Sequence, residues 1–280
     1  MDNGAFCHLN NVSYYSLFDT AVARCLLDVG YLDIARSPVI GLVAETKCRF
    51  YKPIAFPDAV HCGLRVAVLG KSSVRIDIGL FRNEEDVAAA EGHFVHVYVA
   101  RDTGRPVPLP DRLPDLFMSL RRPGVPSAAG SSASRREPES RAQYVRFLHH
   151  TTRWMDNDAY RHMNNVVYYS FLDTAITRLL LDEGFLDLDA NAAIGIAAES
   201  RCSFFRPIAF PDAVVSGLRV AHVGQSSVRF DIALFRNQED TASAQGHLVH
   251  VFVDPEGGRP VRMPDNLRAH LEECRGGASA

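Results

Sequence analysis

The segment DNDAYRHMNNVVYYS at residues 156–170 decides the fold, because nearly the same segment, DNGAFCHLNNVSYYS, stands at residues 2–16. The likeness continues downstream, since residues 2–111 and 156–265 align without a gap at a constant offset of 154 (156 − 2), and roughly six positions in ten are identical. A repeat this long indicates a duplicated domain and not a short solenoid unit. The copies differ at one position that bears on chemistry, where the second has Asp158 and the first has Gly4.

The segment between the copies, residues 121–140, is rich in Ser, Gly, Pro and Arg and has no hydrophobic periodicity. This composition is typical of a flexible linker. We therefore predict a first domain at residues 1–120, a linker at 121–140 and a second domain at 141–274. A chain of 280 residues is long enough for each domain to bury its own core.

Composition excludes several classes of protein. The net charge of −3 gives no basic face for nucleic acid, and no apolar run approaches the ~20 residues that a membrane span requires. The N-terminus lacks the basic and apolar regions of a signal peptide, so we expect a soluble protein of the cytoplasm, with an organellar matrix as the alternative. Only Cys48 and Cys202 correspond between the copies and no CxxC occurs, so we expect reduced thiols, with neither a metal site nor a cofactor.

Hydrophobic periodicity predicts one long helix followed by strands in each copy. In the second copy, apolar residues at spacings of three and four predict a helix at 165–183. Alternation and turn residues predict strands at 193–205, 213–223, 227–236 and 244–253, with a leading strand within 142–154. The first copy repeats this pattern, with its helix at 11–29, but the sequence begins where its leading strand is expected. Either the gene model is truncated or the first domain natively lacks this strand.

This order of elements indicates an α+β domain with the helix packed on one face of a curved antiparallel sheet. A single sheet of this kind leaves edges and a second face to cover. We therefore expect the two units to pair as an intramolecular pseudo-dimer, which the tandem chain favours by keeping both units at high effective concentration.

Three stretches together resemble a known family. They are the run D-x-D-x-x-x-H-x-N-N-x-x-Y that starts at Asp156, FFRPIAFPD at 204–212 and GQSSVR at 224–229. In this order they resemble the hotdog-fold acyl-CoA thioesterases of the 4-hydroxybenzoyl-CoA thioesterase type, over nearly all of both copies. The resemblance implies a tandem hotdog fold and thioester hydrolysis, with Asp158 acting as nucleophile or as general base. It also implies that a backbone N–H at the helix start, that of Asn165, binds the carbonyl oxygen. The unpaired first-turn N–H groups and the positive end of the helix dipole independently suit that task.

Other polar side chains near this motif have both a functional and a structural interpretation. His162 either holds a water and takes part in catalysis or only fixes the shape of the loop, and Asn164 either contacts substrate or caps the helix. Tyr168 either lines the acyl pocket or belongs to the core. Arg206 and Arg229 either meet the phosphates of coenzyme A or are solvated charges at strand ends.

The leading hypothesis is hydrolysis of an acyl-CoA to free acid and CoA at Asp158. The first copy, with Gly4, is then catalytically degenerate and supplies mainly one side of the substrate-binding site, unless Asp2 replaces the missing carboxylate. One alternative is a non-catalytic protein that binds acyl-CoA or another apolar ligand, or that serves in assembly. Hydration of enoyl-CoA is disfavoured, because Asp158 and His162 are four apart with no Asn-Pro between them. The acyl group and the choice between nucleophile and base stay open, and we expect the tandem chain to form a homo-oligomer.

Overall fold

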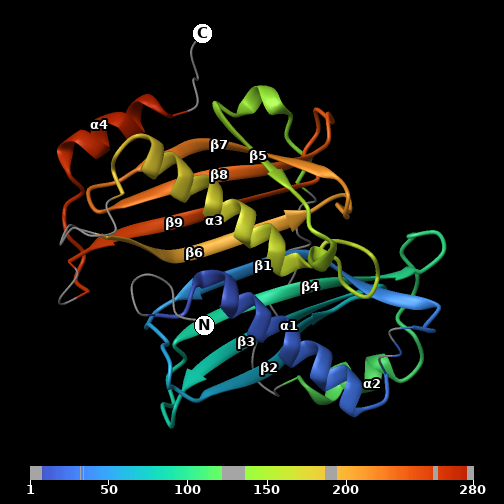
Figure 1. Ribbon diagram of the computed structural model, residues 1–280. Helices are drawn as coiled ribbons and strands as arrows, with labels where there is room; N and C mark the ends of the chain where they lie inside the picture. The colour runs from blue at the N-terminus through green and yellow to red at the C-terminus, as the bar shows by residue number, and fades with distance from the viewer. Residues whose placement is uncertain are drawn as a thin grey trace. The chain divides into compact units, whose positions relative to one another are not determined.

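A computed structural model describes residues 8–31, 33, 35–121, 136–186, 194–254 and 258–275. The chain divides into two compact units, Met1–Arg136 and Glu137–Ala280. Each unit combines one long helix with an antiparallel sheet (Figure 1), which confirms the predicted α+β class and the tandem hotdog units. Gly4 and Asp2, which distinguish the first copy, lie outside the described residues.

The second unit contains the long helix α3 (Asn165–Asp182) and five strands in the spatial order β6-β9-β8-β7-β5. The strands are β5 (Arg146–Thr151), β6 (Ile194–Phe204), β7 (Ala213–Val223), β8 (Ser227–Arg236) and β9 (Ala244–Val253). Two 3-10 turns, η1 (Arg141–Gln143) and η2 (Trp154–Asp156), flank β5, and α4 (Asp265–Glu273) ends the unit. The bounds of β7, β8 and β9 are those expected from the sequence, whereas the two turns and α4 were not predicted.

The first unit contains α1 (Asn11–Asp28) and four strands in the order β2-β3-β4-β1. The strands are β1 (Val39–Phe50), β2 (Val60–Leu69), β3 (Ser73–Arg82) and β4 (Ala90–Ala100), followed by the short helix α2 (Leu113–Ser119). No strand in the described part of this unit corresponds to β5. The β2 strand is therefore an edge strand, paired with β3 alone among the described residues.

Each long helix lies over one face of the sheet of its own unit (Figure 1). Large apolar side chains of the helix are buried there. In α3, Tyr169, Leu172 and Ile176 are almost completely buried. In α1, the ring of Phe18 packs edge-on against Phe94 of β4, with 6.0 Å between ring centroids. Burying one such side chain contributes roughly 1.5–3 kcal/mol, so each helix has a fixed position over its sheet. The start of the helix, where the motif lies, is fixed with it.

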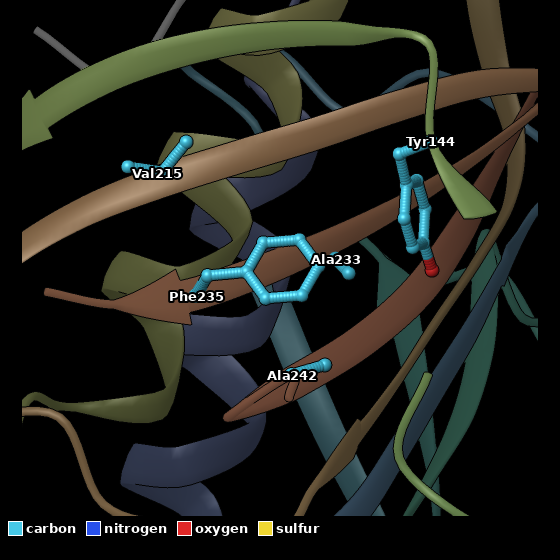
Figure 2. Packing of buried hydrophobic residues seen from close by; sticks show 5 residues of the cluster. All are labelled: Tyr144, Val215, Ala233, Phe235 and Ala242. Carbon is cyan, nitrogen blue, oxygen red and sulfur yellow. The ribbon is translucent and has the colours of Figure 1, made fainter. Parts of the chain in front are cut away.

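The opposite face of the sheet in the second unit, here called the outer face, is covered by the chain itself. Tyr144, which precedes β5, packs with Val215, Ala233, Phe235 and Ala242 in a buried cluster (Figure 2). Residues 137–140, which composition assigned to the linker, also bond to this unit, since Glu139 N–H donates to the Gln245 side chain at 2.8 Å. The flexible stretch expected from composition therefore does not extend to residue 140, and residues 122–135 lie outside the described residues.

Among the described helices, none combines the length and the apolar character that a bilayer crossing requires.

Candidate active site

The motif of the second unit forms a tight loop before α3. Asn157 and Met163 form an antiparallel bridge that closes the loop, and Asp158 N–H donates to the carbonyl of His162 at 2.7 Å. The turn needs one residue in the left-handed region, which Arg161 supplies with φ of 65°. The loop therefore returns the chain to its starting point, and Asp158 lies directly beside His162.

The Asp158 carboxylate is held by the backbone of its own loop. Its Oδ1 atom accepts hydrogen bonds from Tyr160 N–H at 2.7 Å and from His162 N–H at 3.2 Å. This is the side-chain-to-backbone pattern for which Asp is favoured in turns. Within the described part of the chain the other oxygen, Oδ2, has no hydrogen-bond partner. One oxygen therefore fixes the orientation of the group, and the second is available for chemistry.

The surroundings of Asp158 favour its protonated form. Burial raises the pKa of this carboxyl above its ordinary value, and the N–H groups of His162 and Tyr160 oppose the shift only in part. The charge of the His162 side chain also acts to lower the pKa of Asp158. A half-buried carboxylate of raised pKa is a stronger base than a solvated one, which is the property that general-base chemistry requires.

The start of α3 is fixed by Asn164. Its side-chain oxygen accepts from Val166 N–H at 2.9 Å, and its own N–H donates to the carbonyl of Asp156 at 2.8 Å. Asn10 caps α1 in the same way, accepting from Val12 N–H at 2.9 Å. Asn164 thus caps α3 in the second unit, as Asn10 caps α1 in the first. Asn165 is the first residue of α3, so its N–H lies at the positive end of an 18-residue helix.

A second segment, after β6, braces the loop from the other side. The Ile208 carbonyl accepts from Met163 N–H at 2.7 Å, and the side-chain oxygen of Asn157 accepts from Phe210 N–H at 3.0 Å. These partners lie far apart in sequence, and Asn157 was not among the candidate residues. Its recurrence as Asn3 in the first copy is the one signal that marked it.

Tyr168, a predicted substrate contact, lies in the core. Its side chain is 4% exposed, its hydroxyl accepts from Ile208 N–H at 3.2 Å, and its ring meets Phe204 edge-on at 5.0 Å. Burial raises the pKa of this hydroxyl, and the charge of Asp158 contributes to the shift. In the first unit Tyr14 makes the same bond, at 3.2 Å to Ile54 N–H. These contacts are those of a scaffold residue that supports the loop from below.

The two arginines proposed for coenzyme A are engaged in ion pairs. Arg206 bonds Glu239 at 2.9 Å and the carbonyl of Thr241 at 3.3 Å, whereas Arg229 bonds Asp231 at 2.8 Å on β8. Neither bonds to the loop of Asp158 among the described residues. The structure therefore brings together Asp158, His162, Asn164 and Asn165, while Arg206 and Arg229 have partners elsewhere.

Asp156, the first acidic residue of the motif, is buried and committed to its neighbour. Its side chain is 1% exposed and accepts from the backbone N–H of Arg153 at 2.6 Å and from the Arg153 guanidinium at 2.7 and 3.0 Å. Because Asp156 recurs as Asp2 in the copy that has Gly4 in place of Asp158, the sequence favours a structural role for it, and these bonds fit that role. In the part of the chain that the structure describes, no three His, Cys, Asp or Glu side chains converge as a metal site would require.

Comparisons with known proteins give one family match and several matches of fold. A family model described as the thioesterase-like superfamily matches residues 1–117 and 152–271. The solved 12:0-ACP thioesterase from Umbellularia californica matches with a TM-score of 0.72 and 12% identity, over 90% of this chain and 90% of that chain. An acyl-ACP thioesterase from Bacteroides thetaiotaomicron matches with a TM-score of 0.66 and 10% identity, over 87% of this chain and 90% of that chain. At such identities the likeness shows the fold alone.

A third structure, the PA5185 protein from Pseudomonas aeruginosa, is 44% identical, with a TM-score of 0.49, over 51% of this chain and 99% of that chain. A comparison with curated proteins found no match.

Proposed function

The chain belongs to the thioesterase-like superfamily, as the motif indicated, and from this premise we propose that it hydrolyses the thioester of an acyl-CoA to a free acid and CoA. The second unit carries the reaction, and Asp158 is its catalytic carboxylate.

One observation carries the proposal. The Asp158 carboxylate is oriented by two backbone N–H groups on Oδ1 and keeps Oδ2 without a hydrogen-bond partner among the described residues. Asp33 accepts two backbone N–H groups in the same way but is exposed, whereas Asp158 is half-buried and burial raises the pKa of its carboxyl. The α3 helix begins seven residues later (165 − 158), so a carbonyl carbon facing Oδ2 would have its oxygen near the helix start.

The chemistry follows from these positions in either of two forms. As a general base, Asp158 takes a proton from water, the water oxygen attacks the carbonyl carbon, and the Asn165 N–H stabilises the negative oxygen. The intermediate then expels the thiolate, which takes up the proton from Asp158. As a nucleophile, the Asp158 carboxylate itself attacks the carbonyl carbon and expels the thiolate, which takes a proton from solvent. Water then hydrolyses the resulting mixed anhydride to the free acid and regenerates the Asp158 carboxylate. Both forms need the same residue in the same place.

The carrier of the acyl group is the next question. The motif resembles acyl-CoA thioesterases, whereas two structures of the same fold act on acyl groups of acyl carrier protein by their names. We favour acyl-CoA because the motif and its order of elements resemble acyl-CoA thioesterases over nearly all of both copies, whereas the likeness to the two carrier-protein enzymes, at 12% and 10% identity, is one of fold. Acyl-carrier-protein thioesters are the second candidate for the same reaction.

The test is release of free thiol from acyl-CoA esters of increasing chain length, with acyl-carrier-protein thioesters in a parallel arm. We expect turnover of acyl-CoA by the natural chain and its loss in Asp158→Asn. The matched control is Asp33→Asn, because the Asp33 Oδ1 also accepts two backbone N–H groups, from Ala35 at 3.1 Å and Arg36 at 3.0 Å. The control should keep full turnover.

Full turnover in Asp158→Asn would disprove the assignment of Asp158. If thiol is released from the carrier-protein esters and not from acyl-CoA, the substrate is the second candidate, an acyl-carrier-protein thioester. Absence of release from every ester, by a chain that still binds acyl-CoA, would favour the non-catalytic alternative.

A further inference from the structure

The outer face of the second unit has a built-in occupant, the segment at residues 137–145. Tyr144 of this segment is 6% exposed and lies against Phe235, with 5.8 Å between ring centroids (Figure 2). Beneath them, Gly217 leaves room for both rings. A Cβ atom at this position would lie 3.0 Å from Tyr144 Cβ and 3.0 Å from Phe235 Cε2. Segment and sheet are thus in close contact.

Charged groups complete this contact. The Tyr144 hydroxyl donates to Glu139 at 2.8 Å, Arg219 pairs with Glu139 at 2.9 Å, and the Arg219 guanidinium lies 4.9 Å from the centre of the Tyr144 ring. Arg141 lies in the same manner 4.7 Å over the ring of Phe235. Such cation–π contacts add to the attraction of an ion pair. The segment therefore binds the sheet through three of its own residues: an acidic residue, an Arg two positions later and a Tyr three positions after the Arg.

The first unit has the same binding surface without an occupant among the described residues. At the offset of 154, Gly63, Phe81 and Arg65 correspond to Gly217, Phe235 and Arg219. A Cβ atom at Gly63 would meet only Phe81 within 4 Å, at 3.2 Å. The Arg65 side chain is 54% exposed, against 21% for Arg219. Three of the residues that hold the segment are thus present in the first unit, and two of them, Gly63 and Arg65, are exposed.

The backbone that would receive the Arg of an occupant is also the same. In the second unit Arg141 donates to the carbonyls of Asn237 at 3.0 Å and Glu239 at 2.9 Å, in the turn after β8. The corresponding turn after β3 has Asn83 at φ of 53°, against 52° for Asn237. The turn of the first unit therefore has, at this Asn, the same left-handed conformation as the turn that binds the guanidinium in the second.

The edge beside this surface is open as well. In the second unit, β5 pairs with β7 from Arg146↔Leu218 to Thr151↔Ala213. The corresponding residues 60–64 of β2 pair with β3 on one side, and no described residue continues the sheet on the other. An open edge strand presents unpaired N–H and C=O groups that an extended peptide can complete.

We propose that the β2 edge and the surface formed by Gly63, Arg65 and Phe81 together bind an extended polypeptide segment. Its chemistry is that of residues 137–151: an acidic residue, an Arg two positions later, a Tyr three further on, and then a short strand. Edge-to-edge pairing of two copies through β2 would cover the edge, but it would bring neither Tyr nor Arg to Phe81. The surface therefore favours the peptide.

The test uses the full chain and a synthetic peptide of residues 137–151 with a fluorophore at its C-terminus. We expect saturable binding with one peptide per chain, measured by fluorescence anisotropy. Arg65→Glu should weaken binding by about tenfold or more, because it opposes the acidic residue of the peptide. The matched control is Arg24→Glu on α1, whose side chain is 74% exposed and which should bind the peptide normally. A peptide carrying Tyr144→Ala should also bind at least about tenfold more weakly.

A second measurement locates the bound peptide. A photoreactive group on the ring at the position of Tyr144 should crosslink to residues 61–88 of the first unit, as identified by mass spectrometry. Crosslinks to residues 215–242 would mean exchange into the second unit and would overturn the proposal. So would absence of binding, binding that Arg65→Glu leaves unchanged, or a β2-paired dimer that excludes the peptide.

Discussion

Two substitutions of Asp158 should have the same effect on turnover and different effects on stability. The carboxylate has two tasks in this structure: Oδ1 holds the loop, and Oδ2 is proposed to act on the thioester. Asp158→Asn keeps an oxygen that can accept from both N–H groups, whereas Asp158→Ala removes it. The two variants have in common the loss of the negative charge and of the second oxygen, which the proposed reaction needs.

The magnitudes follow from the two hydrogen bonds. Asp158→Ala leaves the N–H groups of Tyr160 and His162 without their acceptor, and each bond contributes about 1 kcal/mol net. Because the group is only half-buried and water can replace part of the loss, we expect unfolding free energy to fall by about 1–2 kcal/mol. Asp158→Asn should cost about half as much or less. Turnover should fall by about 100-fold or more in both variants.

The assay is urea unfolding followed by the fluorescence of Trp154, the single Trp of the chain, which lies four residues before Asp158. Thiol release is measured on the same preparations. The two control variants, Asp33→Ala and Asp33→Asn, should differ in unfolding free energy in the same direction, with the Ala variant less stable, and both should keep turnover. Their unfolding is followed by far-UV circular dichroism. Equal stability of the two Asp158 variants would refute the argument from the loop, and retained turnover in either would refute the argument from Oδ2.

Four further outcomes are expected. Asn164→Ala and Asn10→Ala should each cost about 1 kcal/mol by loss of the helix cap, measured by urea unfolding, and only Asn164→Ala should lower turnover. Because burial raises the pKa of Asp158, kcat/KM should decline with falling pH at a midpoint above about 4, the ordinary carboxyl value, in a pH–rate profile. Burial lowers the pKa of His96 to about 4, from 6.5 in the unfolded chain, so neutral His96 contributes its full stability above about pH 6.5 and loses it as the pH falls. The free energy of unfolding should therefore drop by about 2 kcal/mol between pH 7.5 and pH 5. His96→Leu should reduce this drop, as measured by urea unfolding at both pH values. Tyr144→Ala should destabilise the second unit by about 3 kcal/mol and Tyr144→Phe by about 1 kcal/mol, as measured by the same Trp fluorescence.

The elements that could be predicted from the sequence are those whose local pattern and tertiary environment agree. The β8 and β9 strands have the predicted bounds, because alternating side chains and flanking turn residues define a strand with two unlike faces. The cap of α3 could also be predicted, since Asn164 precedes the first periodic residue. In contrast, α4 has only two buried apolar residues, Leu267 and Leu271, too few for a clear helical period.

The contacts that could not be predicted depend on residues distant in sequence. Residues 137–140 have the composition of a linker, and their bonds to Gln245 and Arg219 on the outer face of the sheet make them part of a unit. Arg206 was a candidate for phosphate binding because of its place in the motif, and its partner Glu239 lies 33 positions away. Composition and spacing carry no information about such pairs, whereas the position of Asp158 before a helix is local and could be predicted.

The duplication separates scaffold from function more sharply than any single contact. Tyr14 and Tyr168 both accept from an Ile N–H at 3.2 Å and meet a Phe ring at 5.0 Å, so this arrangement persists in a unit that has Gly4 where the second has Asp158. An arrangement that is kept without this carboxylate does not depend on it and serves the fold. The Oδ2 atom of Asp158, which has no counterpart in the first copy, is the part of this residue that the hydrogen bonds of the loop do not explain. The outer face is a different case, because Arg65 and Phe81 are kept in a unit where no described residue occupies the surface that they form. Because Arg65 is exposed and its pairing with Asp77 alone contributes little to stability, its retention favours a binding role.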